Sequence, residues 1–321
     1  YVTEPEKVVI KKYDRKTVAY VYEMIEKDLV EGLPLISDQA YTVPAYHFTK
    51  IAANAFASRF YLYKKNYDKV IEHASLVAGP SGFAANMRNW NTDYSTKSFT
   101  IIASIYSQAS EKSNLLLTET GSYWARNWAG ARYGLSPNLG RELYFADQPG
   151  GGTLSYSLFG GEQGVYLPKY NELFVRVSPS ADIGNGYLMI PLFTTEEVLF
   201  NRAEAYLSKG NTAGFLADLN TFLSLRIEGY TPSANALTVA KNNAFYGTTN
   251  TNAALMETLM YYRRVEFMHE GMRWFDLLRF KLPITHNNIS GSSQTLSATD
   301  PKRVLQIPQE SVLSGLPLNP R

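Results

Sequence analysis

The chain has 321 residues, 45% hydrophobic and 19% charged, so it can bury a large core and does not have the composition of a disordered protein. Its 31 basic and 29 acidic residues nearly cancel and are scattered, which excludes the clustered positive charge typical of nucleic-acid-binding proteins. The absence of cysteine excludes disulfides and thiolate metal sites, and no apolar run reaches the roughly 18 residues of a membrane-spanning helix.

A helix is predicted near the start of the chain. Its apolar positions follow the spacing of one helix face: Val18, Val21, Tyr22, Ile25 and Leu29. Asp14 is the expected N-cap, and Gly32 with Pro34 is expected to end the helix. The sequence opens directly on the segment that leads into this helix, without a signal peptide. We therefore expect the chain to be the C-terminal part of a longer protein whose leading portion is missing.

Two helical hairpins are predicted, over residues 45–78 and 195–226. Pro44 suits the first position of a helix, where its missing N–H costs nothing. Thr194 and Glu197 have the spacing of a capping box, which predicts the start of the second hairpin.

The two hairpins resemble each other in sequence. Their alignment matches Tyr61 with Tyr206, Leu62 with Leu207, Asn66 with Asn211, and Ile71 with Leu216. Small residues early in the first helix and a Tyr-Leu pair near its end are typical of tetratricopeptide-type hairpins, because small residues let paired helices approach closely. The pattern predicts a helical-repeat scaffold.

A loop-rich insert, residues 81–190, separates the hairpins. It holds most of the glycines, three of the four tryptophans, and many Asn, Ser and Tyr residues. We expect irregular structure with a few short strands, for example over residues 98–106. Binding residues are often carried by loops on a rigid scaffold, so the insert is the expected place for a ligand site.

Aromatic and polar residues concentrate within this insert. The candidate ligand-binding residues are Trp90, Tyr94, Tyr123, Trp124, Arg126, Asn127 and Trp128, with Tyr133 close by. A sugar ring has an apolar C–H face and a rim of hydroxyls, so its receptor needs an aromatic plate beside amide, guanidinium or carboxylate groups. The alternative is that the tryptophans pin the insert onto the helices, since tryptophan is highly buried on average.

A third helical region is predicted over residues 251–280, with a possible break at Gly271. It is dense in charge, but Glu266 and Glu270 lie one helical turn apart, as do Arg273 and Asp276 at a spacing of three. Catalytic carboxylates flank a substrate from opposing surfaces, so we interpret these groups as ion-paired bracing.

Three other side chains of this region are expected to be structural. His269 has no partner at metal-ligand spacing and is interpreted as a packed histidine. Trp274 and Phe275 are expected to anchor the core.

Three passages resemble the SusD/RagB family of glycan-capture lipoproteins from Bacteroidetes. The strongest comprises Arg263, Arg264, Glu266, Glu270, Gly271, Arg273, Trp274, Phe275, Asp276, Leu277 and Arg279. The second is the hairpin around Arg202, Ala203, Glu204, Ala205, Tyr206 and Leu207. The third is the ending Ile307, Pro308 and Gln309, followed by Asn319 and Pro320.

The resemblance implies a single SusD-like domain over residues 1–321, mainly α, with tetratricopeptide-like helical hairpins and a large loop-rich insert. Within it, residues 1–80 would form a repeat region, 81–190 the insert with the ligand site, and 191–321 a C-terminal repeat and signature region.

The function implied by the resemblance is non-catalytic. The chain would bind an oligo- or polysaccharide at the cell surface and deliver it to a SusC-like TonB-dependent outer-membrane transporter, without a cofactor. It would be a lipoprotein of the outer membrane whose anchor is not present in this chain. The alternatives are a glycoside hydrolase or lyase, a tetratricopeptide-type peptide-binding scaffold, and a family member that binds another nutrient. The glycan and the participation of calcium stay open.

Overall fold

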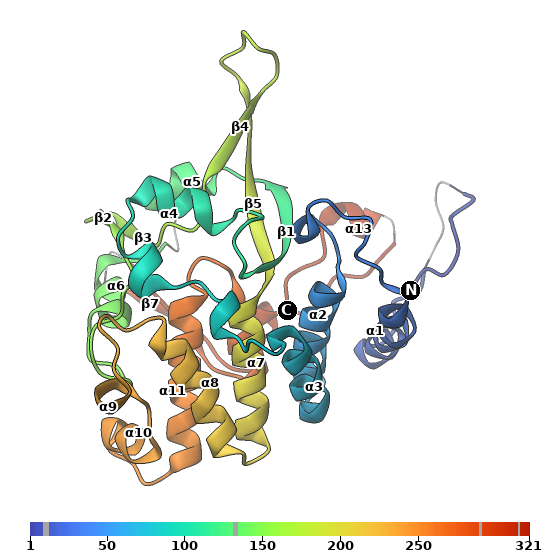
Figure 1. The fold of residues 1–321 in the computed structure, drawn as a ribbon. Helices are drawn as coiled ribbons and strands as arrows, with labels where there is room; N and C mark the ends of the chain where they lie inside the picture. The colour runs from blue at the N-terminus through green and yellow to red at the C-terminus, as the bar shows by residue number, and fades with distance from the viewer. Residues whose placement is uncertain (9–12, 131–133, 289–290, 314) are drawn as a thin grey trace.

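The computed structural model describes residues 1–8, 13–130, 134–288, 291–313 and 315–321. The predicted mainly α fold is confirmed. Helices form the body, and a long β-hairpin rises from it (Figure 1).

The first helix, α1, spans Val18–Gly32 and ends in the 3-10 turn η1, Leu33–Leu35. Its N-cap is Thr17, whose hydroxyl accepts the amide N–H of Tyr20. The prediction of Asp14 as N-cap is wrong, because only the residue directly before the helix can reach the free amides of its first turn.

The first hairpin consists of α2 (Lys50–Tyr63) and α3 (Tyr67–Ala78). Thr49 caps α2 by accepting the amide of Ala52. Pro44 begins only the short 3-10 turn η2 (Pro44–Tyr46), so its predicted place at the start of the α-helix is wrong.

The second hairpin consists of α7 (Thr195–Ser208) and α8 (Thr212–Ser224). Thr194 caps α7 by accepting the amide of Glu197 at 3.3 Å, as predicted. The Glu197 carboxylate does not return to Thr194 but pairs with Arg59 of α2 at 2.5 Å.

The two hairpins stack, since α3 packs against both α2 and α7, and α7 packs against α8 (Figure 1). The predicted repeat scaffold is confirmed.

The third helical region has α11 (Thr251–Glu266) and α12 (Met272–Arg279), separated by a break. Gly271 lies at the predicted break with φ 76°, and His269 also has a positive φ of 69°. Two shorter helices, α9 (Pro232–Asn235) and α10 (Val239–Tyr246), precede α11.

The insert contains more helix than expected. Residues 98–106 were expected to form a strand, but the structure places helix α4 there, Phe99–Tyr106. Ile102, Ala103 and Tyr106 occupy its buried face. The prediction failed because a short apolar run fits a strand or a buried helix equally well, and tertiary packing decides between them.

The other elements of the insert are short turns and strands. The helical ones are η3 (Ala84–Asn86), a π-helical turn η4 (Trp90–Tyr94), α5 (Trp124–Asn127), η5 (Trp128–Gly130) and α6 (Pro137–Tyr144). The strands are β1 (Asn114–Gly121), β2 (Phe159–Gly161), β3 (Gly164–Tyr166), β4 (Glu172–Arg176) and β5 (Gly184–Thr194).

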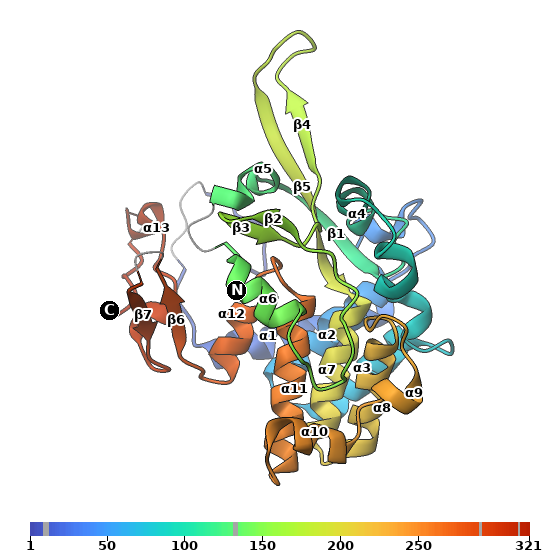
Figure 2. The same ribbon diagram turned by 90° about the vertical axis from the view of Figure 1, so that its left-hand side faces the viewer.

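Strand β5 lies between β1 and β4 in an antiparallel sheet, and β2 pairs with β3. Figure 2 shows β4 and the start of β5 projecting beyond the body as an arm. The chain closes with a hairpin, a 3-10 turn and a helix: β6 (Ile284–Asn287), β7 (Ser293–Leu296), η6 (Pro301–Arg303) and α13 (Gln309–Leu313).

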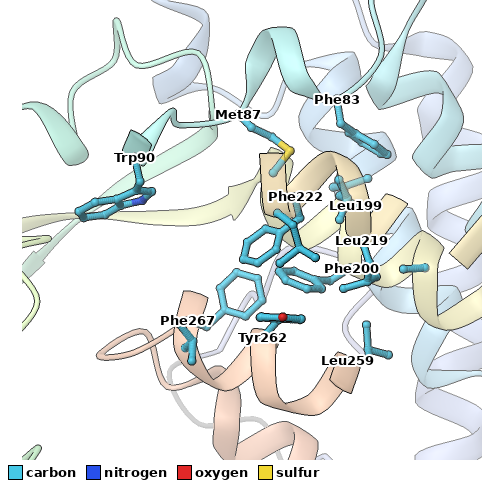
Figure 3. Packing of buried hydrophobic residues seen from close by; sticks show 14 of the residues in the cluster. Phe83, Met87, Trp90, Leu199, Phe200, Leu219, Phe222, Leu259, Tyr262 and Phe267 are labelled. Carbon is cyan, nitrogen blue, oxygen red and sulfur yellow. The ribbon is translucent and has the colours of Figure 1, made fainter. Parts of the chain in front are cut away.

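One hydrophobic core joins the insert to the repeats (Figure 3). Phe200 of α7, Phe222 of α8 and Tyr262 of α11 meet there with ring centroids 4.8 to 5.6 Å apart. Phe83 and Trp90 enter the same core from the insert. The insert is therefore held by the burial of its own large side chains.

A buried charge network lies beside this core; we call Arg88, Glu196, Arg226 and Glu266 the core ion network. Arg226 contacts Glu266 at 2.9 Å and Glu196 at 3.3 Å, and Arg88 contacts Glu196 at 3.2 Å. The four side chains are at most 1% exposed. Two cations and two anions balance, and the pairs tie the insert to the ends of α8 and α11.

Candidate functional site

Two of the predicted ligand-binding residues lie in the core. Trp90 is 0% exposed and packs on Tyr156 at 4.8 Å, and Tyr94 is 2% exposed and donates to Glu111 at 2.5 Å. A ligand cannot reach either ring without unfolding the insert. Trp90 therefore fits the alternative interpretation, that the tryptophans hold the insert onto the helices, and Tyr94 is buried in the same core.

The other five predicted residues are brought together by the short helix α5 and the turn η5; we call this segment, residues 123–128, the α5 turn. It follows directly after β1, and the amide of Ser122 donates to Gly186 of β5 at 2.9 Å. The hydroxyl of Ser122 accepts the amide of Trp124 at 3.2 Å, which starts the helical turn. Tyr133 lies outside the described residues.

Trp124 and Trp128 form the inner layer of the α5 turn and are half-buried. The Trp128 ring stacks on Tyr166 at 5.4 Å, and the Trp124 ring lies 5.0 Å from Tyr166 and 4.8 Å from His269. These rings therefore fix the turn on the protein and keep only part of their surface for a ligand.

Tyr123, Arg126 and Asn127 form the outer, solvent-exposed layer, with Tyr123 44% exposed. Arg126 pairs with Glu172 of β4, and its guanidinium lies 5.1 Å from the Phe174 ring. The Asn127 amide is exposed and can both donate and accept. An aromatic face, an amide and a guanidinium thus share one surface, as sugar recognition requires.

Glu172 is a residue of this site that the sequence did not indicate. It lies 46 positions from Arg126 and reaches it because β4 pairs with β5, next to the point where β1 ends. A contact between distant strands leaves no local pattern in the sequence.

His269 supports the aromatic layer from below. Its Nε2 accepts the amide N–H of Leu167 at 3.2 Å, so the ring is neutral with the proton on Nδ1. Burial, together with the nearby charge of Lys169, lowers the pKa of His269 to about 3. The interpretation of His269 as a packed histidine agrees with this geometry.

The acidic residues of the family-like segment have ion partners, but mostly different ones from those expected. Glu266 pairs with Arg226, and Glu270 pairs with Lys169 beyond the end of α11. Asp276 pairs with Arg263 at 3.1 Å and Arg279 at 3.0 Å.

Two predictions for this segment are wrong, one about an ion pair and one about a core anchor. Among the described residues Asp276 forms no ion pair with Arg273, because Arg263 and Arg279 each already occupy one of its two carboxylate oxygens. Phe275 is 45% exposed and not a core anchor, since α12 turns it outward, 6.4 Å from Tyr63. Trp274 is half-buried.

Within the described ranges, no three His, Asp or Glu side chains converge as metal ligands. Among those same residues, no helix combines the length and the apolar character needed to cross a bilayer.

Two family models match the chain. Residues 145–311, about half of the sequence, match the SusD family, and residues 1–62 match a SusD-like model described as starch-binding associating with outer membrane. The chain therefore belongs to the SusD/RagB family.

Solved structures share the fold. A SusD superfamily protein from Bacteroides thetaiotaomicron has a TM-score of 0.61 at 20% identity, covering 96% of this chain and 67% of its own. A SusD-like protein from Bacteroides fragilis has a TM-score of 0.61 at 16% identity, with 95% and 71% covered. A SusD-like carbohydrate binding protein from Bacteroides vulgatus has a TM-score of 0.55 at 15% identity, with 93% and 65% covered. No curated protein matches the sequence.

Proposed function

We propose that this protein binds an oligo- or polysaccharide through the α5 turn and passes it to a SusC-like TonB-dependent transporter, as a surface lipoprotein of the outer membrane. Family membership supports the class, and the carbohydrate-binding protein from Bacteroides vulgatus supports the kind of ligand. The observation that carries the proposal is the outer layer of the α5 turn, in which Tyr123, Arg126 and Asn127 are exposed together above the half-buried rings of Trp124 and Trp128.

We propose binding and not hydrolysis. Glu266 and Glu270, the carboxylates most closely spaced in the family-like segment, are held by Arg226 and Lys169. A general acid and its partner need access to the scissile bond, which these buried groups do not have. Incubation with the bound glycan should therefore release no reducing sugar, and release would favour a glycosidase.

Tyr123→Ala and Asn127→Ala test the site, because both side chains are exposed and neither is part of the core. Wild-type protein should bind at least one member of a polysaccharide panel in affinity electrophoresis, with Kd on the order of micromolar to millimolar. Each variant should weaken that binding, by about 1 kcal/mol for the loss of an aromatic contact.

Phe245→Ala is the matched control. Phe245 is 43% exposed, like Tyr123, but it lies on α10 at the far end of the body from the α5 turn (Figure 1). Unchanged binding by folded Tyr123 and Asn127 variants would place the site elsewhere. Binding of peptides and not glycans would favour the repeat-scaffold alternative.

A further inference from the structure

A cleft lies on the side of the β2–β3 hairpin, next to α6. It has a volume of about 360 Å³ and is lined by Pro137, Arg141, Phe145, Leu158, Gly160, Gly161, Glu162 and Val165. We call it the α6 cleft. A shallower hollow adjoins it, with Arg141 and Phe145 in both walls and Glu142 at its edge. This volume is within the range of small-molecule sites, about 300 to 1,000 Å³.

Helix α6, which contributes Pro137 and Arg141 to the α6 cleft, is anchored to its neighbours by hydrogen bonds and close packing. Tyr144, at the end of α6, donates to the carbonyl of Val265 at 2.8 Å, and Tyr261 donates to the carbonyl of Leu143 at 2.7 Å. Gly140 packs so closely on β3 that an added Cβ would come within 2.8 Å of Val165. The hollow is therefore shaped before any ligand arrives.

Phe145 gives the cleft an aromatic plate. It follows α6 as its C-cap residue and is 58% exposed, whereas its neighbours Leu143 and Tyr144 are buried in the core. A large aromatic side chain left in solvent beside an apolar hollow costs free energy that contact with a ligand would recover.

The charged groups around Phe145 are free for a ligand. Within the part of the chain that the structure describes, Arg141, Glu142 and Glu162 form no ion pair, and Arg141 makes only a 3.2 Å contact with Asn138. A guanidinium donates to hydroxyl oxygens, and a carboxylate accepts hydroxyl protons. These three groups have a net negative charge, which repels an acidic sugar and not a neutral one.

The α6 cleft is continuous with the α5 turn. Gly160 lines the cleft, and a Cβ placed on it would lie 3.1 Å from the Trp128 ring. Figure 2 shows α5, the β2–β3 hairpin and α6 side by side on one part of the molecule. One glycan chain can therefore cross from the α5 turn over β2 into the cleft.

We propose that the α6 cleft is a second carbohydrate subsite, which takes a neutral sugar unit of the same glycan chain that the α5 turn binds. Phe145 stacks on the ring face, while Arg141 and Glu162 bond its hydroxyls. This inference rests on the proposed function.

The test uses Phe145→Ala and Glu162→Gln. The second variant is nearly isosteric and Glu162 is exposed, so we expect it to fold like the wild type. Phe245→Ala again serves as the control. The probes are amylopectin, mixed-linkage β-glucan, xyloglucan, galactomannan and polygalacturonate in affinity electrophoresis. Calorimetry then compares the disaccharide and hexasaccharide of the polymer that binds. Both variants should weaken hexasaccharide binding, by about fivefold for the aromatic contact, and should affect the disaccharide less.

The outcomes separate the two proposals. Loss of affinity with Tyr123→Ala but none with Phe145→Ala or Glu162→Gln would overturn the second subsite and keep the proposed function. Binding of polygalacturonate alone would overturn the assignment to a neutral sugar. Binding of no probe by the wild type would overturn both.

Discussion

His269, which packs against the inner aromatic layer of the α5 turn, makes the stability of the folded protein depend on pH. Its neutral ring accepts the amide of Leu167, and protonation would remove that acceptor within a buried environment. The pKa is lowered from 6.5 to about 3 in the folded state. Between these values the unfolded chain binds a proton that the folded chain does not, so stability falls as pH falls.

Replacement with asparagine, which tolerates a positive φ, should remove this contribution. For the wild type, His269 should contribute a slope of about 1.4 kcal/mol per pH unit to the free energy of unfolding between roughly pH 6 and 3. His269→Asn should have a smaller slope than the wild type in urea melts across that window. Equal slopes in the two proteins would contradict the assignment.

Trp90 permits a second test at the residue scale. Its ring is fully buried, and among the described residues its indole N–H has no hydrogen-bond partner. Trp90→Ala should therefore cost about 3 to 5 kcal/mol through the cavity it leaves. Trp90→Phe should cost clearly less, because it keeps a ring and removes a buried polar group without a partner. Chemical denaturation of both variants measures the difference, and equal losses would argue against this account.

Sequence patterns predict residues 122–128 as a candidate site, because this short segment holds aromatic rings beside an amide and a guanidinium group. They could not separate its residues from Trp90 and Tyr94, because composition does not tell a buried ring from an exposed one. Phe145 and Glu162, which we propose as subsite residues, could not be predicted for a related reason. Each is an ordinary residue in its local sequence, and only the packing of α6 on the β2–β3 hairpin brings the two to one cleft.

At the scale of elements, helices were predictable where their signals were local. Thr194 marks the start of α7, and Gly271 marks the break before α12. The apolar stripe marks one face of α1. Each of these signals is contained in a short stretch of sequence. The segment that became α4 carries no such signal in its apolar run, and Tyr106 and Ile102 meet partners far along the chain. Pairing of β5 with β1 and β4 also depends on distant residues.

Gly271, at the break between α11 and α12, and Gly32, at the end of α1, should differ in how much stability is lost when each is replaced by alanine. Gly271 has φ 76° and Gly32 has φ −83°, and an added Cβ would meet nothing at either position. Gly271→Ala should therefore destabilise the protein by about 1 to 2 kcal/mol from backbone strain alone. Gly32→Ala, at a helix end with ordinary φ, should be neutral or slightly stabilising. Thermal denaturation of the two variants provides the comparison.

At the scale of the whole molecule, the core ion network joins the insert to the repeat scaffold. Burial alone would raise the pKa of Glu266, but the charges of Arg226 and Lys169 outweigh it and lower the pKa to about 2. The unfolded value is 4.5. This carboxylate therefore contributes stability above pH 4.5 that is lost as pH falls toward 2.

Removal of one cation from the network should be costly. Arg226→Met leaves Glu266 and Glu196 buried without their shared partner and should destabilise the protein by about 3 to 5 kcal/mol. Arg176→Met breaks an ion pair with Asp182 on the exposed arm and should cost at most about 1 kcal/mol. If denaturant melts give the two variants a similar loss in free energy of unfolding, the buried ion pairs contribute no more stability than the exposed one.

The two layers of the α5 turn have a consequence for how the binding preference that we propose for it can be altered. Trp124 packs on His269 and Trp128 stacks on Tyr166, whereas Tyr123 and Asn127 are exposed. Substitutions in the outer layer cost little stability, because exposed positions rarely contribute much to it. A library of variants at residues 123 and 127 alone can therefore be screened for new ligands. Trp124 and Trp128 would hold the backbone of the turn in place in every variant.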